Sequence, residues 1–418
     1  AGLAMVGAAG YGFQALAGHT LPAADKAAAL AVYVIINIIG PGVFTALEQE
    51  TSRATSGALT VGRSIRPVAV KAALLGLVLL VVVLIALSVL LPVLVGPVLH
   101  RNWLLYGAIM LGAVSAAGGY LVRGILSGTR RYDGYAVTLA VEGLSRLLPC
   151  VFVAVASLAA APAYSFIFAI GTGCAGLAGL PWALRPVQAS SVSVPGEAPG
   201  QGRQMTYGLL ALVGASLLTQ LVANAAPVEV SGKLIGNPSL AASFTAAFGL
   251  VRLPLFLFAP VPSVLLPGLT EAAVRGRYDV VRTRLRLILL AVAAVGVPGA
   301  IATLLLGPWA NRVLFGMEVG LPTVVFGVLG VSTVMLMIAQ VLQPALIALG
   351  RHRMATLAWA AGCASLFALF FLPGDPISVA VVAQVSAGVL VVLVMGVALF
   401  AALRSNGRST PAPEQVDH

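Results

Sequence analysis

Residues 68–98 read VAVKAALLGLVLLVVVLIALSVLLPVLVGPV, and they hold one charged side chain, Lys71, near their start. A helix needs about 20 apolar residues to cross the hydrocarbon core of a bilayer. A helix also satisfies its backbone polar groups within the segment, which lipid cannot do for them. The stretch therefore predicts one membrane-spanning helix.

The rest of the chain has a similar composition. Of its 418 residues, 60% are hydrophobic and 9% are charged, and the mean hydropathy is +1.03. Soluble globular domains carry about 25% charged residues, so the sequence predicts a polytopic membrane protein. The net charge of +11 would suggest a nucleic-acid partner in a soluble protein. No basic run carries interleaved aromatic residues, and we therefore predict no nucleic-acid partner.

Breaks at charges, prolines and glycines predict an all-α integral membrane protein with about twelve transmembrane helices. The predicted helices cover residues 1–17, 28–50, 68–95, 103–127, 135–159, 163–184, 206–226, 240–270, 285–306, 321–349, 355–372 and 377–403.

The loops between these helices alternate in charge. With twelve spans, 18 of the 24 Lys and Arg residues fall on one side, counting Arg123 with Arg130 and Arg131 in one loop. Basic residues accumulate in cytoplasmic loops, so we expect that side and both termini to be cytoplasmic. The expected location is the plasma membrane.

The two halves of the chain resemble each other. Ala46–Glu48 ends the second predicted helix as Leu269–Glu271 ends the eighth, and Gly96-Pro97 matches Gly307-Pro308. Six helices per half give a parallel repeat, so we predict two six-helix bundles related by a pseudo-twofold axis along the membrane normal. The predicted parts are an N-terminal lobe (1–185), a cytoplasmic linker (186–204), a C-terminal lobe (205–403) and a disordered tail (404–418).

Two arginines, Arg146 and Arg252, lie in the middle of apolar runs, one in each half. An arginine at that depth costs about 2.5–3.5 kcal/mol on insertion scales, and it usually has a partner or a function. Glu142 precedes Arg146 by four residues, so the two share a helix face and can pair. Two interpretations stay open. In the first, the ion pair lets both charged residues enter the membrane. In the second, Arg146 binds an anion, while Glu142 holds Arg146 in place or carries a proton.

Other polar residues have weaker functional interpretations. Glu48, Arg53 and Glu271 lie at the ends of predicted helices. They are either solvated charges or part of a gate that breaks during transport. Gln14, Gln220 and Asn224 lie inside predicted spans. They either form hydrogen bonds between helices or line a cavity. The cysteines and histidines have no metal or disulfide spacing, and no phosphate-binding loop is present. We expect no metal, no cofactor and no catalytic residues, and so no enzyme.

The segment between the fourth and fifth predicted helices carries the sequence RGILSG at 123–128, RRY at 130–132 and EGLSR at 142–146. It resembles the same segment of bacterial polysaccharide flippases, in the multidrug/oligosaccharidyl-lipid/polysaccharide exporter superfamily. The resemblance implies two lobes around a V-shaped cavity and alternating access. It implies that a polyprenyl-diphosphate-linked oligosaccharide or polysaccharide precursor is flipped from the inner to the outer leaflet. Arg146 and Arg252 suit binding of the diphosphate, because a guanidinium offers two parallel donors.

The partners so implied are the lipid-linked glycan, membrane lipids, and a glycan polymerase or glycosyltransferases. Three alternatives remain. A lipid II flippase of the same superfamily usually has fourteen spans. A cation-coupled multidrug exporter often has a carboxylate in its first spans, whereas Met5–Gly18 has none. The third alternative is a membrane scaffold that assembles a glycan-synthesis complex without transporting.

Overall fold

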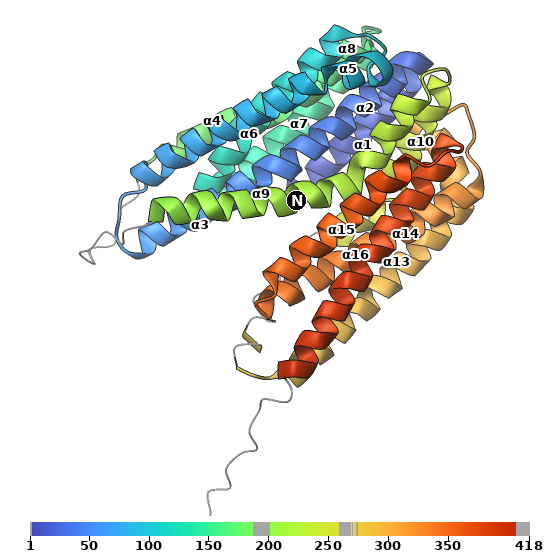
Figure 1. Cartoon of the computed structure of the whole chain (residues 1–418). Helices are drawn as coiled ribbons and strands as arrows, with labels where there is room; N and C mark the ends of the chain where they lie inside the picture. Colours follow the sequence, from blue (N-terminus) through green and yellow to red (C-terminus); the bar gives the residue numbers. More distant parts are fainter. Residues whose placement is uncertain (1, 187–200, 259–268, 270, 273–274, 407–418) are drawn as a thin grey trace, which may run out of the picture. The chain divides into compact units, whose positions relative to one another are not determined.

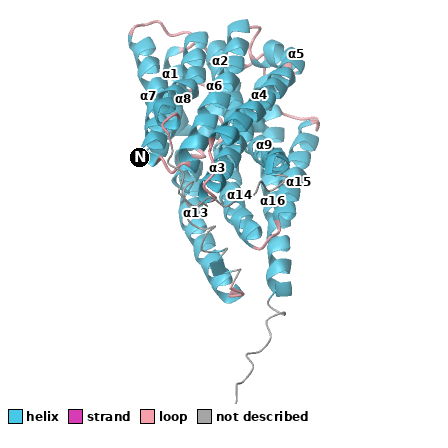
Figure 2. Cartoon of the chain, turned by 90° about the vertical axis from the view of Figure 1, so that its left-hand side faces the viewer, coloured by secondary structure: helices cyan, strands magenta, loops and turns pink. Residues whose placement is uncertain are grey.

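The structure is a computed structural model that describes residues 2–186, 201–258, 269, 271–272 and 275–406. Every regular element in these ranges is a helix (Figures 1 and 2). The helices pack into two compact units, one of Ala1–Ala246 with Trp309–Gly320, the other of Ala247–Pro308 with Leu321–His418.

The first unit holds most of the N-terminal helices, coloured blue to green in Figure 1. They are α1 (Gly2–Thr20), α2 (Ala23–Ile39), η1 (Gly40–Phe44), α3 (Thr45–Thr60), α4 (Arg66–Val89), α5 (Leu91–Val93), η2 (Leu94–Val98), α6 (Trp103–Gly128), α7 (Tyr132–Val155), α8 (Ala161–Ala183) and α9 (Gln201–Lys233).

The second unit holds α11 (Leu253–Phe258), α14 (Thr323–Ala348), α15 (His352–Phe370) and α16 (Pro376–Asn406). Two helices, α10 (Pro238–Leu250) and α13 (Tyr278–Phe315), belong partly to each unit. Within the second unit, α16 packs against both α14 and α15.

Small residues allow the central helices of the first unit to approach closely. Helix α6 packs along α8, and α7 packs against α8 and α1. A Cβ atom on Gly119 would lie 2.5 Å from the carbonyl oxygen of Thr172, and one on Gly176 would lie 3.0 Å from the Gly119 Cα. Helices in lipid associate through such close packing, because lipid tails are as apolar as the side chains. The contact fixes α8 against α6 at the depth where the candidate site lies.

Proline changes the hydrogen-bond ladder of the second predicted span. Pro41 has no N–H to donate, and the helix passes through the π-helical turn η1, in which the N–H of Thr45 bonds to the carbonyl of Gly40. Helices α2 and α3 thereby form one continuous stretch of 38 residues, Ala23–Thr60, where the sequence predicted 28–50. The part after the π-helical turn, α3, carries Glu48, Glu50 and Arg53.

Eleven helices in the described residues are long and apolar enough to cross a membrane. Helix α1 occupies the first predicted span but is not among them, because its 19 residues include five glycines, a glutamine and a histidine. Helix α4 has mean hydropathy 3.1 in its most apolar window and leaves most of its side chains exposed, as a lipid-facing helix would.

Some predicted boundaries differ from the structure or fall outside it. Residues 201–204, predicted as linker, begin α9, and that helix extends to Lys233 rather than ending at 226. The remainder of the linker except Pro186 lies outside the described residues, as do residues 259–268 of the eighth predicted span and 407–418 of the tail. The division into lobes at 185 and 205 stays a prediction.

Candidate functional site

Arg146 lies in α7 and is 6% exposed. Its Nη1 atom is 2.9 Å from Oε1 of Glu142, one turn earlier on the same helix. Its Nε donates to the Phe168 carbonyl at 3.1 Å, and its Nη2 donates to Oγ1 of Thr172 at 2.8 Å, both on α8. The guanidinium carbon is 4.0 Å from the centre of the Phe168 ring, a cation–π distance. Every nitrogen of the Arg146 guanidinium group therefore has a partner, and Nε and Nη2 join α7 to α8.

A second arginine binds the same carboxylate. Arg123 of α6 donates through Nη2 to Oε2 of Glu142, and its Nε donates to Oγ1 of Thr138 at 3.1 Å. Thr172 also donates to Glu142, at 2.8 Å. Arg123 and Glu142 are each 4% exposed. We refer to Arg123, Glu142 and Arg146 as the two-arginine cluster.

Arg123 was missed by the sequence analysis, which counted it with the basic residues of a cytoplasmic loop. That assignment was wrong, because α6 continues to Gly128 and Arg123 is buried inside it. A signal was present in the sequence. Arg123 follows an apolar run and precedes Gly124-Ile125-Leu126, which continues the apolar pattern beyond the charge.

Glu48 extends the charged region on the α3 side. Its Oε1 accepts a hydrogen bond from the Tyr135 hydroxyl at 2.8 Å, and its charge interacts with that of Arg123. Two guanidinium groups and two carboxylates thus lie close together in α3, α6 and α7. Glu48, which was a gate candidate in the sequence analysis, is an electrostatic neighbour of the two-arginine cluster.

The next acidic residue, Glu50, is almost fully buried and binds Arg53 at 2.9 Å and 2.5 Å. The Arg53 side chain itself is 61% exposed. A Cβ atom on Gly208 of α9 would lie 3.1 Å from Oε2 of Glu50. Arg53 thus covers a carboxylate that is enclosed between α3 and α9.

Arg252, in the second unit, lies at the break between α10 and α11 and is 8% exposed. Its guanidinium carbon is 4.0 Å from the centre of the Phe248 ring, and its backbone N–H donates to the Gly249 carbonyl at 3.1 Å. Pro254 lies two residues further on and cannot donate a backbone hydrogen bond, which accounts for the break. Glu271 pairs with Arg275 at 2.9 Å on an exposed surface, where an ion pair contributes little.

The amide candidates have local partners. Gln14 in α1 is 1% exposed and donates to the Gly10 carbonyl at 3.4 Å, a long hydrogen bond. Gln220 accepts a hydrogen bond from Asn224 at 2.7 Å along α9. Within the described part of the chain, no three His, Cys, Asp or Glu residues are grouped so that they could hold a metal ion.

No protein-family model and no curated protein sequence matches this chain. Solved structures do match. An inward-facing multidrug resistance MATE family transporter of the MOP superfamily is 12% identical, with 97% of this chain and 96% of that chain covered and a TM-score of 0.75. The lipid II flippase MurJ, in an inward closed conformation, is 14% identical, with 96% and 88% covered and a TM-score of 0.66.

The Vibrio cholerae MATE transporter VcmN in the bent form is 17% identical, with 97% of each chain covered and a TM-score of 0.58. Similarity at sequence identities this low shows a shared fold alone. The chain therefore has the multi-helix membrane fold that is found in MATE transporters and in the lipid II flippase.

Proposed function

We propose that the protein is a flippase that moves a polyprenyl-diphosphate-linked oligosaccharide or polysaccharide precursor from the inner to the outer leaflet by alternating access. The fold supports the general class, because the similar structures are transporters and a flippase. The sugar-lipid substrate rests on the chemistry of the two-arginine cluster and on the sequence resemblance.

The observation that carries the proposal is that two buried guanidinium groups bind one carboxylate, that of Glu142. Guanidinium donors fit the oxygens of a phosphate as well as those of a carboxylate. A diphosphate brings about two negative charges where Glu142 brings one, so it can compete for the same donors. Protonation of Glu142 would favour this exchange by releasing both arginines. In this proposal the carboxylate occupies the anion site while substrate is absent.

Arg252 is the corresponding candidate in the second unit. Both Arg146 and Arg252 place the guanidinium carbon 4.0 Å from the centre of a phenylalanine ring. An aromatic face holds a guanidinium in orientation and itself adds no full negative charge that an anion would have to displace. This arrangement suits a residue that must bind and release an anion.

The membrane potential would assist such transport. Moving two negative charges outward from an interior that is about 100 mV negative is downhill and releases about 4–5 kcal/mol if the charges move uncompensated. Arginines that bind the diphosphate cancel part of this, so coupling to an ion gradient is compatible with the proposal.

A cation-coupled multidrug exporter is the second candidate, favoured by a specific observation. The MATE transporter in the inward-facing conformation has a TM-score of 0.75, above the 0.66 of the lipid II flippase. The carboxylates of Glu48 and Glu142 would then be the cation- or proton-binding groups. Against this, α1 contains no carboxylate. The same experiment distinguishes the two remaining alternatives, a lipid II flippase and a scaffold that transports nothing.

The test is transport by the full chain in proteoliposomes. One cargo is a fluorescent polyprenyl-diphosphate oligosaccharide, and the competing cargoes are fluorescent lipid II and a cationic dye. The variants are Arg146→Gln, Arg252→Gln and Arg146→Lys, with Lys233→Ala as the control, since Lys233 lies in an exposed pair with Glu229. Circular dichroism and insertion efficiency establish that each variant is folded.

We expect the wild type and Lys233→Ala to flip the oligosaccharide lipid and both Gln variants to lose this activity. Arg146→Lys should retain only a fraction, because an ammonium group lacks the paired donors of guanidinium. Movement of the dye alone, dependent on a sodium or proton gradient, would replace the proposal with the exporter. Preference for lipid II would change the cargo, and no movement of any cargo would favour the scaffold.

A further inference from the structure

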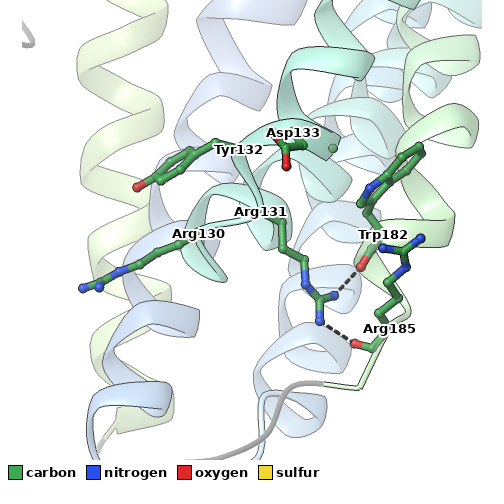
Figure 3. A pocket seen from close by; sticks show the side chains of 7 residues that line it. Arg130, Arg131, Tyr132, Asp133, Trp182 and Arg185 are labelled. Atoms are coloured by element: carbon green, nitrogen blue, oxygen red, sulfur yellow. Dashed lines mark hydrogen bonds between the residues drawn. The ribbon is translucent and has the colours of Figure 1, made fainter.

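A pocket of about 360 Å³ lies away from the two-arginine cluster, where α6 turns into α7 beside the end of α8. Figure 3 shows its lining from close by. The residues that line it are Arg130, Arg131, Tyr132, Asp133, Gly134, Trp182 and Arg185. Three of the seven are arginines and one is acidic, so the lining carries a net charge of about +2.

Arg131 forms part of the wall. It donates hydrogen bonds to the carbonyl oxygens of Trp182, in the last turn of α8, and of Arg185 (2.8 Å), which follows that helix (Figure 3). It also donates to the carbonyl oxygen of Pro186 at 3.0 Å. A cation is favourable there, because the carbonyls at the end of a helix carry partial negative charge. Burial and the nearby charge of Arg185 both lower the pKa of Arg131. The two like charges are thus held close together by the fold.

The other two arginines keep exposed side chains. The guanidinium carbon of Arg185 is 5.5 Å from the centre of the Trp182 ring. Arg130 and Tyr132 extend to the other side of the turn in Figure 3. Among the described residues, no carboxylate forms an ion pair with any of the three arginines, Asp133 included. The pocket therefore presents positive charge that no carboxylate in the described part of the chain neutralises.

Its position fits a membrane surface. Tyr132 is the first residue of α7, and Trp182 is the last residue but one of α8, both candidate spans. Tyrosine and tryptophan at span ends mark the level of the lipid headgroups. The loops here are also among those predicted to be cytoplasmic from their basic residues, and that leaflet carries anionic lipids.

We propose that this pocket binds the phosphate of an anionic lipid headgroup, such as phosphatidylglycerol. Arg185 donates to the phosphate oxygens, Arg131 lies beside it and adds its charge, and Arg130 attracts the anionic headgroup from the other side of the turn. Trp182 contacts the glycerol and the first methylene groups on the same side as Arg185. The site is independent of the transported substrate, because its ligand stays in its own leaflet.

The experiment measures lipid retention by the full chain. Purified protein is titrated with phosphatidylglycerol in detergent, with phosphatidylcholine as the neutral lipid, and bound lipid is counted by native mass spectrometry. The variants are Arg130→Asn, Arg185→Gln and the double variant. Asparagine is chosen at 130 because the backbone φ of 57° there is tolerated by Asn better than by most residues. Arg404→Gln is the matched control, an exposed arginine 5.7 Å from the Phe400 ring.

An arginine near an anionic membrane surface contributes about 1 kcal/mol, so each substitution should weaken phosphatidylglycerol binding about fivefold. The Arg404→Gln variant should bind like the wild type, and phosphatidylcholine should bind weakly throughout. Wild-type binding by the double variant, or an equal loss in Arg404→Gln, would overturn the site. Displacement of the lipid by excess inorganic phosphate would overturn the lipid as its occupant and assign the pocket to a soluble phosphate.

Discussion

Replacing Glu142 with glutamine tests the two-arginine cluster most directly. The substitution keeps the size of the side chain and removes the charge that Arg123 and Arg146 share. Both arginines stay buried, at 4% and 6% exposure, and the threonine, backbone and glutamine amide oxygens that can accept their hydrogen bonds are all uncharged. Removing one partner of a buried ion pair costs about 3–5 kcal/mol, because the remaining charge is left uncompensated. We expect Glu142→Gln to lose free energy of unfolding in this range.

The matched control is Glu229→Gln. Glu229 pairs with Lys233 at the same 2.9 Å and the same four-residue spacing as Glu142 with Arg146, but its side chain is 31% exposed. An exposed pair contributes about 0–1 kcal/mol. The assay is reversible unfolding in mixed micelles of dodecyl sulfate and a mild detergent, monitored by circular dichroism. The free energy of unfolding of each variant is compared with that of the wild type.

A second substitution makes the reasoning stricter. Adding Arg123→Gln to Glu142→Gln leaves one buried guanidinium instead of two, so the double variant should recover part of the loss. With the single variant Arg123→Gln as well, the double-mutant cycle gives the coupling energy between Arg123 and Glu142. A loss below about 1 kcal/mol in Glu142→Gln, equal to that of the exposed control, would contradict the buried charge pairing on which the argument rests.

Three further predictions follow from the packing and hydrogen bonds of the first unit. A Cβ on Gly171 would lie 2.5 Å from Cγ of Arg146, so Gly171→Ala should destabilise by about 1–3 kcal/mol in the same unfolding assay. Gly118→Ala, where nothing lies within 4 Å, should be neutral or stabilising, and equal effects would contradict the crowding. Tyr135→Phe removes the hydrogen bond to Glu48 and should cost about 1–3 kcal/mol, whereas an unchanged midpoint would show that water replaces the hydroxyl. A Cβ on Gly18 would overlap the carbonyl oxygen of Phe315, so Gly18→Ala should lower the thermal midpoint by several degrees, while Gly214→Ala in open space should not.

The helical membrane fold could be predicted because it depends on length and composition alone. A run as long and as apolar as 68–98 predicts a membrane-spanning helix by itself. The four-residue spacing of Glu142 and Arg146 likewise predicts their contact within one helix. The predicted helix centres correspond to observed helices wherever the structure describes them. The ends shifted, as at Lys233, because Pro227 lies inside a long helix that continues past it although one backbone hydrogen bond is lost there.

The contacts between helices could not be predicted in the same way. Arg123 pairs with Glu142 across nineteen positions, and the pair joins α6 to α7, two helices that both pack on α8. Likewise, α9 joins the first unit through contacts with α2 and α3, such as Gly208 beside Glu50. Such contacts depend on the shapes of two surfaces that no single helix specifies. An arginine near the predicted end of a span is also ambiguous by position alone, since a shift of one turn decides whether it is buried.

The π-helical turn at Gly40–Phe44 sets the direction in which the side chains after it point from the same helix. In an α-helix each residue advances the side chains by about 100° around the axis, so a turn that accommodates one extra residue rotates the downstream face by that amount. Glu48 faces Tyr135, and Glu50 faces Gly208, only with this offset. A single-residue deletion inside the turn would leave the span's length and hydropathy nearly unchanged. It would nevertheless turn both carboxylates away from their partners, so the chain is far less tolerant of a length change here than its apolar composition suggests.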